Sequence, residues 1–107
     1  MRPESPDYRT RRTAEYSAMD LLIKKGYRVI RVAQSHTHES AGINLVTWDK
    51  DGKVFFIYAR SSRRGSIRDD IKTLSDLKSI CHFPGHVQYW VRDKSGWIRY
   101  QINPYLH

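Results

Sequence analysis

Residues 43–60 read INLVTWDKDGKVFFIYAR, and this stretch decides the fold. Two apolar segments, 43–49 and 53–60, lie on either side of a Lys-Asp-Gly triplet at 50–52. A hairpin loop of three residues with glycine in the left-handed position suits such a triplet. The stretch therefore predicts two antiparallel strands at the centre of a sheet.

The length of this loop sets the register of the hairpin. A three-residue loop pairs Asp49 with Lys53, which places Asn44 opposite Tyr58 on the same face of the sheet. Arg60, two residues beyond Tyr58, shares that face. A two-residue loop would shift the register by one residue and separate Asn44 from Tyr58.

Helical periodicity appears on both sides of the hairpin. The first helix is expected over residues 10–25, where a basic last turn and Gly26 mark its end. The second begins at Ser66, where Ser-x-x-Asp resembles a capping box. The apolar stripes of the two helices consist of Ala14, Ala18, Leu21 and Leu22, and of Ile67, Ile71, Leu74, Leu77 and Ile80.

Alternating β-branched and aromatic residues predict three further strands, at 27–32, 86–92 and 97–102, the last two joined by a loop at 94–96. The order is α-β-β-β-α-β-β. Both central strands carry apolar residues on both faces, so both faces should be covered. We expect a loose N-terminal arm at residues 1–9 and a single α/β domain with a mixed sheet at 10–107.

Composition limits the function classes. The chain has 107 residues, 39% of them hydrophobic, which is enough for one core. A net charge of +8 favours a polyanionic partner, nucleic acid first and an anionic membrane surface second. No apolar run exceeds the six residues 54–59, and the first residues lack the apolar stretch of a signal peptide. The single cysteine, Cys81, excludes an internal disulfide, and we expect a cytoplasmic protein.

The element order and two segments, Gly42-Ile43-Asn44-Leu45-Val46 and Ile57 to Arg64, resemble the PD-(D/E)xK nuclease superfamily. The pattern over about residues 10–92 is most similar to archaeal Holliday-junction resolvases. In that family the first segment reads Pro-Asp and the second Glu-x-Lys-Ser, with a glutamate from the first helix as helper. The resemblance implies a restriction-endonuclease-like fold, a homodimer and DNA as the partner.

The resemblance also implies a degenerate active site. It places Asn44 at the metal-binding aspartate, Tyr58 at the metal-binding glutamate, Arg60 at the catalytic lysine and Glu15 at the helper glutamate. An amide and an uncharged phenol bind Mg²⁺ poorly, and a guanidinium does not exchange protons usefully. Glu15 lies at the edge of its helix stripe, where it either leans over the sheet or stays exposed near the helix start. We therefore predict no metal cofactor and no catalysis.

One alternative is a Mg²⁺- or Mn²⁺-dependent nuclease or junction resolvase that uses Glu15 with Glu39 from the polar loop, because Asp49 and Asp51 are too far along the strand. Another is a dimeric scaffold that binds other proteins. A zinc site remains open if His36, His38 and Glu39 meet Cys81, His82 and His86, although isolated loop histidines are commoner.

Basic residues make the positive case for nucleic acid. Guanidinium groups fork onto phosphates, and serine hydroxyls and helix-start amides donate to anions. The alternative is a solvated basic loop. The aromatic residues of the last hairpin belong to the core, contact a second copy, or stack on an unpaired base. The candidate phosphate-binding residues are Arg11, Arg12, Arg60, Ser62, Arg63, Arg64 and Arg68.

Overall fold

The computed structural model describes residues 6–32, 42–61, 66–81 and 85–102. Two helices and five strands follow one another in the order expected from the sequence. No helix within these ranges is long and apolar enough to cross a membrane. The elements are α1 (Pro6–Lys24), β1 (Arg28–Arg31), β2 (Leu45–Trp48), β3 (Val54–Ser61), α2 (Ile67–Cys81), β4 (His86–Asp93) and β5 (Gly96–Ile102).

The five strands form one mixed sheet whose spatial order, β1-β2-β3-β4-β5, is also the order along the chain. Neighbouring strands are antiparallel except β3 and β4, which run parallel. Parallel strands require a crossover connection, and α2 provides it between β3 and β4. The predicted α/β class and mixed sheet are confirmed.

The β2–β3 hairpin has the predicted register. Trp48 pairs with Val54, and the Asp49 amide donates to the Lys53 carbonyl at 3.2 Å, which leaves the triplet at 50–52 as the loop. Gly52 has a φ of 79°, the left-handed conformation that the loop requires. The Asp49 carboxylate accepts hydrogen bonds from the amides of Asp51 and Lys53, both at 2.9 Å.

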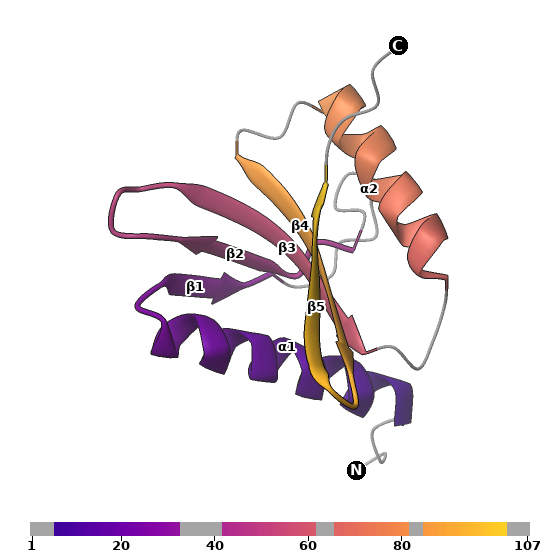
Figure 1. Ribbon diagram of the computed structural model, residues 1–107, viewed down its shortest axis with the longest axis horizontal. Helices are drawn as coiled ribbons and strands as arrows, with labels where there is room; N and C mark the ends of the chain where they lie inside the picture. The colour runs from indigo at the N-terminus through magenta and orange to yellow at the C-terminus, as the bar shows by residue number, and fades with distance from the viewer. Residues whose placement is uncertain (1–5, 33–41, 62–65, 82–84, 103–107) are drawn as a thin grey trace.

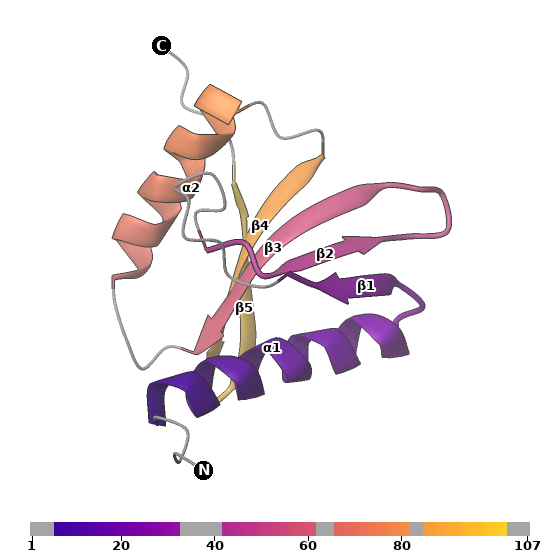
Figure 2. The same ribbon diagram turned by 180° about the vertical axis from the view of Figure 1, so that it is seen from behind.

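The helices lie on opposite faces of the sheet and over different strands (Figures 1 and 2). α1 packs against β1, β2 and β3, whereas α2 packs against β4 and β5. The core is correspondingly divided into two clusters. The cluster under α1 contains Ala18, Leu22, Leu45, Ile57, Ala59 and Trp90, and the cluster under α2 contains Ile43, Leu74, Val87, Tyr89, Val91 and Ile102.

Because each helix covers only part of its face, helix coverage of both faces is not uniform. Ile30 of β1, on the side away from α1, is 52% exposed. On the α1 side Arg99 of β5 is also exposed, although Trp90 and Trp97 of the same hairpin pack against the cluster under α1. This uneven coverage leaves room for a surface pocket on the α1 side.

Most element bounds lie within one or two residues of expectation, but the start of α1 and the second hairpin loop differ in kind. α1 begins at Pro6, inside the stretch expected as a loose arm at 1–9, because proline is well suited to the first turn of a helix. In the second hairpin Asp93 pairs with Gly96, so the loop contains two residues rather than three. Asp93 stabilises this shorter turn by accepting hydrogen bonds from the amide and hydroxyl of Ser95, at 2.8 and 2.6 Å. These bonds lower the pKa of Asp93.

Ser66 caps α2 as predicted. Its hydroxyl oxygen accepts a hydrogen bond from the amide of Asp69 at 3.2 Å, which satisfies one of the free donors at the helix start. Leu74 is fully buried, and Ile67 and Ile71 pack against the same cluster, so the predicted apolar stripe does face the sheet.

Candidate functional site

Glu15 is buried against the sheet rather than exposed at the helix start. Only 4% of its surface is accessible. Its Oε1 accepts a hydrogen bond from Nδ2 of Asn44 at 3.2 Å, and its Oε2 accepts one from Nε of Arg31 at 2.5 Å. The predicted helper glutamate therefore does meet Asn44, and Arg31, a residue that sequence reasoning missed, neutralises its charge.

The side chain of Asn44 is occupied by backbone. Its Oδ1 accepts a hydrogen bond from the amide of Ala59 at 3.0 Å, and its Nδ2 donates to the carbonyl of Ala59 at 2.8 Å. Nδ2 also carries the bond to Glu15, so both of its protons are used. A carboxylate at this position would lack both donated bonds.

Tyr58 and Arg60 lie on the other side of the sheet. The Tyr58 ring lies 5.4 Å from that of Tyr89, which belongs to the cluster under α2. Nη1 of Arg60 donates to Oδ2 of Asp70 in α2 at 2.6 Å. Tyr58 and Arg60 thus share a face as predicted, but Asn44 points to the α1 side.

The expectation that Asn44 and Tyr58 share one face is therefore wrong. The reason lies at the entry to β2, where the alternation of side chains is interrupted: Ile43 belongs to the cluster under α2, and Leu45 to the cluster under α1. The Asn44 amide donates to the carbonyl of Ile57 at 3.0 Å, one residue out of the ladder register. The register was predicted correctly, but it does not extend regularly to Asn44.

A buried polar network surrounds Arg60, whose side chain is only 9% exposed. Oδ2 of Asp70 accepts hydrogen bonds from both Arg60 and the hydroxyl of Tyr89, each at 2.6 Å. Burial by itself lowers the pKa of Arg60, but the hydrogen bond to Asp70 and the electrostatic interactions with Tyr89, Asp70 and Tyr58 together outweigh it, and the pKa is raised. Burial and the hydrogen bond to Asp70 raise the pKa of Tyr89. Nη2 of Arg60 is buried and has no hydrogen-bond partner among the described residues.

Neither the polar group around Glu15 nor the one around Arg60 fits a divalent metal ion. Mg²⁺ needs oxygen ligands, usually carboxylates, with water completing the shell. Among the described residues, each of these polar groups contains one carboxylate. Each carboxylate is already paired with an arginine: Glu15 with Arg31, and Asp70 with Arg60. Within the described ranges no group of three histidine, cysteine, aspartate or glutamate residues is placed to hold a metal.

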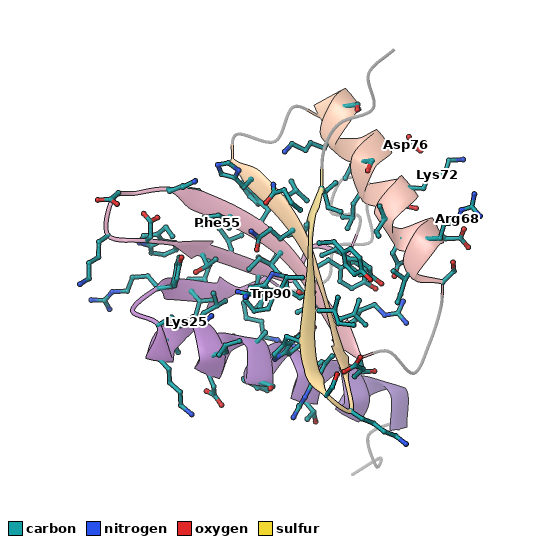
Figure 3. All side chains as sticks on the ribbon, viewed as in Figure 1. Lys25, Phe55, Arg68, Lys72, Asp76 and Trp90 are labelled. Atoms are coloured by element: carbon teal, nitrogen blue, oxygen red, sulfur yellow. The ribbon has the colours of Figure 1, made fainter. Side chains whose placement is uncertain are left out.

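The predicted phosphate-binding residues are placed unevenly. Arg60 is buried in its ion pair, and Arg68 is exposed on α2. Figure 3 shows Arg68 and Lys72 on the outer side of α2, with Asp76 beyond them on the same helix. Arg11 and Arg12 belong to α1, but their side chains, like residues 62–64, lie outside the part of the structure that is described.

The possible zinc ligands fall mostly outside the described residues, whereas the aromatic residues of the last hairpin can be placed. His36, His38, Glu39 and His82 lie outside the described residues, as does the Cys81 side chain. His86 packs on the Phe55 ring, with centroids 5.4 Å apart. Tyr89 and Tyr100 stack in the cluster under α2, whereas Trp90 and Trp97 contact each other on the α1 side.

Sequence reasoning missed Arg31 and Asp70, the two residues that neutralise the candidate site. Arg31 follows Ile30 on the first strand, and Asp70 lies in the first turn of α2, where an acidic residue is explained by the helix dipole alone. The sequence held one signal for Arg31. Residues two apart on a strand share a face, and Val29 faces α1, so Arg31 would face α1 if Val29 did.

A pocket of about 100 Å³ opens on the α1 side of the sheet, beyond the end of α1. Its wall combines aromatic rings with aliphatic side chains, and two basic residues contribute to it. The lining residues are Leu22, Lys25, Tyr27, Thr47, Phe55, Ile57, Gln88, Trp90 and Arg99.

Comparisons with known proteins agree with this geometry at the level of the fold. No protein-family model matches the chain, and no curated protein matches it in sequence. Among solved structures, it is similar to Hjc of Archaeoglobus fulgidus, a Holliday junction resolvase from an archaeal hyperthermophile. The TM-score is 0.59 at 15% sequence identity, over 85% of this chain and 76% of that one.

The chain therefore has the PD-(D/E)xK, restriction-endonuclease-like fold that its sequence pattern suggested. Within that class its architecture is like that of Hjc.

Proposed function

We propose that this protein is a nucleic-acid-binding domain, with DNA as its partner, that has a nuclease fold but not the metal-dependent chemistry of a nuclease. The observation that carries the proposal is the pairing of Glu15, whose two carboxylate oxygens accept hydrogen bonds from Arg31 and Asn44. A carboxylate committed to an arginine and an amide would have to lose both bonds before it could bind a cation.

Charge supports the binding part of the proposal. The chain carries 19 Lys and Arg residues against 11 Asp and Glu residues. The resemblance assigns metal-binding carboxylates to positions 44 and 58, and the neutral side chains of Asn44 and Tyr58 there reduce the negative charge that a nearby phosphodiester would meet. The proposed phosphate contacts are Arg11, Arg12, Ser62, Arg63, Arg64 and Arg68, and their binding should depend on the backbone more than on base sequence.

Arg60 takes a different part in this proposal. Its ion pair with Asp70 and its burial make it a residue that holds the start of α2 against β3. We therefore expect it to position the segment between them rather than to donate directly to a phosphate. We further propose a homodimer, as the resemblance to junction resolvases implies.

Binding to a four-way DNA junction and to duplex DNA tests the proposal. Release of counterions should weaken binding roughly 100-fold between about 50 and about 200 mM salt if about four phosphates are contacted. Substituting Arg63 and Arg64 by alanine should weaken all sequences alike. A double substitution of Lys50 and Lys94, which are exposed in the two hairpin loops, removes the same charge and serves as control.

Cleavage is tested with the same junction and Mn²⁺. We expect none above the background of a Glu15→Gln preparation. Cleavage that disappears in Glu15→Gln would establish the nuclease alternative instead. A stable dimer that binds no nucleic acid at low salt would favour the scaffold.

A further inference from the structure

The pocket on the α1 side is built by the way α1 ends. The Gly26 amide donates to the carbonyl of Ile23 at 3.0 Å, and the Tyr27 amide donates to that of Leu22, also at 3.0 Å. With Gly26 at a φ of 88°, this is a Schellman motif, which brings the residue after the glycine against the last turn of the helix. Tyr27 and Leu22 consequently form one wall of the pocket.

Aromatic rings from the sheet form the rest of the wall. Tyr27 and Phe55 meet edge to face, with centroids 6.1 Å apart. Trp90 is 97% buried, and its indole nitrogen donates to Oε1 of Gln88 at 2.9 Å, which fixes the orientation of the ring. A flat apolar group that enters the pocket therefore meets rings already held in place.

Positive charge accompanies these rings. The guanidinium of Arg99 lies 5.6 Å from the centre of the Trp90 ring, and the ammonium of Lys53 lies 5.7 Å from that of Phe55. Lys25 and Arg99 are both exposed, and both line the pocket. Figure 3 labels Lys25 beside α1. None of the nine described residues that line the pocket is acidic.

This combination matches the chemistry of a nucleotide, in which a planar base is joined to an anionic phosphate. At about 100 Å³ the pocket is smaller than the roughly 300–1,000 Å³ of sites that enclose a drug-sized molecule, so it has room for one ring system. Bases stack on aromatic side chains with little regard to sequence, while lysine and arginine neutralise the adjacent phosphates.

We propose that this pocket receives one unpaired base of a nucleic-acid strand, with Lys25 and Arg99 against the flanking phosphates. The proposal rests on the proposed function, since it names the part of the nucleic acid that the α1 side would recognise. The duplex contacts proposed above would then be joined by a contact with a single-stranded segment, such as a gap or an opened branch point.

The test uses a fluorescent oligothymidylate of about 12 nucleotides and an abasic deoxyribose-phosphate strand of the same length, whose phosphate charge is identical. Anisotropy titrations of the full chain should show about tenfold tighter binding of the strand that carries bases. Phe55→Leu should reduce this preference to about one, provided that circular dichroism and thermal unfolding show a folded variant.

Charge at the rim is tested by a variant in which two exposed side chains are changed. Lys25→Gln with Arg99→Gln should weaken oligothymidylate binding by about tenfold, whereas Arg28→Gln with Lys94→Gln should weaken it less than about threefold. Both double variants remove two exposed charges. Equal losses in the two would overturn the assignment of these cations to the pocket.

The remaining outcomes separate this proposal from the one on which it rests. If duplex DNA binds with strong salt dependence but the two strands bind equally, the pocket assignment fails and the proposed function stands. If no nucleic acid binds, both fail. Binding of thymidine monophosphate as tight as that of the oligonucleotide would overturn the assignment to a strand. Conversion of a dimer to a monomer by the rim variant would make the surface an interface between copies and overturn it as well.

Discussion

Asn44 forms two hydrogen bonds with the backbone of Ala59, one as donor to its carbonyl at 2.8 Å and one as acceptor from its amide at 3.0 Å. The side chain thus takes the place of a strand partner just before β2 begins. A second donated bond ties Glu15 of α1 to the same amide. At the position that the sequence resemblance assigned to a metal-binding aspartate, Asn44 connects α1 to the sheet.

Restoring an acidic residue at this joint should destabilise the protein instead of creating a nuclease. Asn44→Asp removes two donated hydrogen bonds and places a second carboxylate beside Glu15 in a buried site, so we expect a loss of about 2–4 kcal/mol in the free energy of unfolding at pH 7. Urea unfolding measures it.

The pH dependence of this variant provides the control. Burial and the neighbouring carboxylate raise the pKa of the introduced acid in the folded state, so the folded variant binds an extra proton as the pH falls. The difference in stability from the wild type should therefore narrow from pH 7 to pH 5. Equal stability of the two proteins at pH 7 would show that the bonds of Asn44 contribute little.

The ion pair of Arg60 with Asp70 should be strongly coupled. Asp70→Asn leaves a guanidinium that is 91% buried without its counter-charge, and we expect a loss of about 3 kcal/mol. Arg60→Met with Asp70→Asn should cost less than the sum of the single substitutions, as measured by a double-mutant cycle in urea. Asp76→Asn, on the exposed side of α2, is the control and should change stability by at most about 0.5 kcal/mol.

A side chain at Gly42 should destabilise the protein for two separable reasons. Its φ is 86°, and a Cβ atom there would lie 2.6 Å from the Tyr58 ring. At Gly52 the φ is 79°, but no atom of the described part of the chain lies within 4 Å of an added Cβ. Gly52→Ala therefore measures the backbone cost, about 1 kcal/mol, and Gly42→Ala should exceed it by about 1–2 kcal/mol because of the ring. Similar losses in the two variants, measured by thermal unfolding, would mean that the ring moves aside without cost.

Stability should fall at alkaline pH partly through Tyr89. Its pKa is raised above the ordinary value of about 10 in the folded state, so the folded protein keeps a proton that the unfolded chain releases. This contribution is complete below about pH 10 and is lost as the pH rises toward the folded pKa. We expect Tyr89→Phe to cost about 1 kcal/mol at pH 8 and to lose less stability than the wild type between pH 9 and 11. Parallel pH profiles in urea unfolding would contradict the assignment.

The fold was predictable because its signals are local. The Lys-Asp-Gly loop set the hairpin register, the glycine at position 26 ended α1, and Ser66 capped α2. Alternation and helical periodicity predicted the strands and helices themselves, since each pattern shows which residues of one element share a face. The same kind of signal failed at Asn44, where an interrupted alternation turns the side chain toward α1, and a local pattern cannot reveal that interruption.

The sequence by itself determined the element order, the mixed sheet, the surplus of positive charge and the absence of acidic residues at positions 44 and 58. Only the tertiary structure decided that Arg31 neutralises Glu15, that Asp70 holds Arg60, and that the end of α1 forms a pocket with β2, β3, β4 and β5. Arg31 lies 16 residues from Glu15, and Asp70 lies 10 from Arg60. Such partners meet only through the packing of whole helices against the sheet, which the spacing of residues along the chain does not encode.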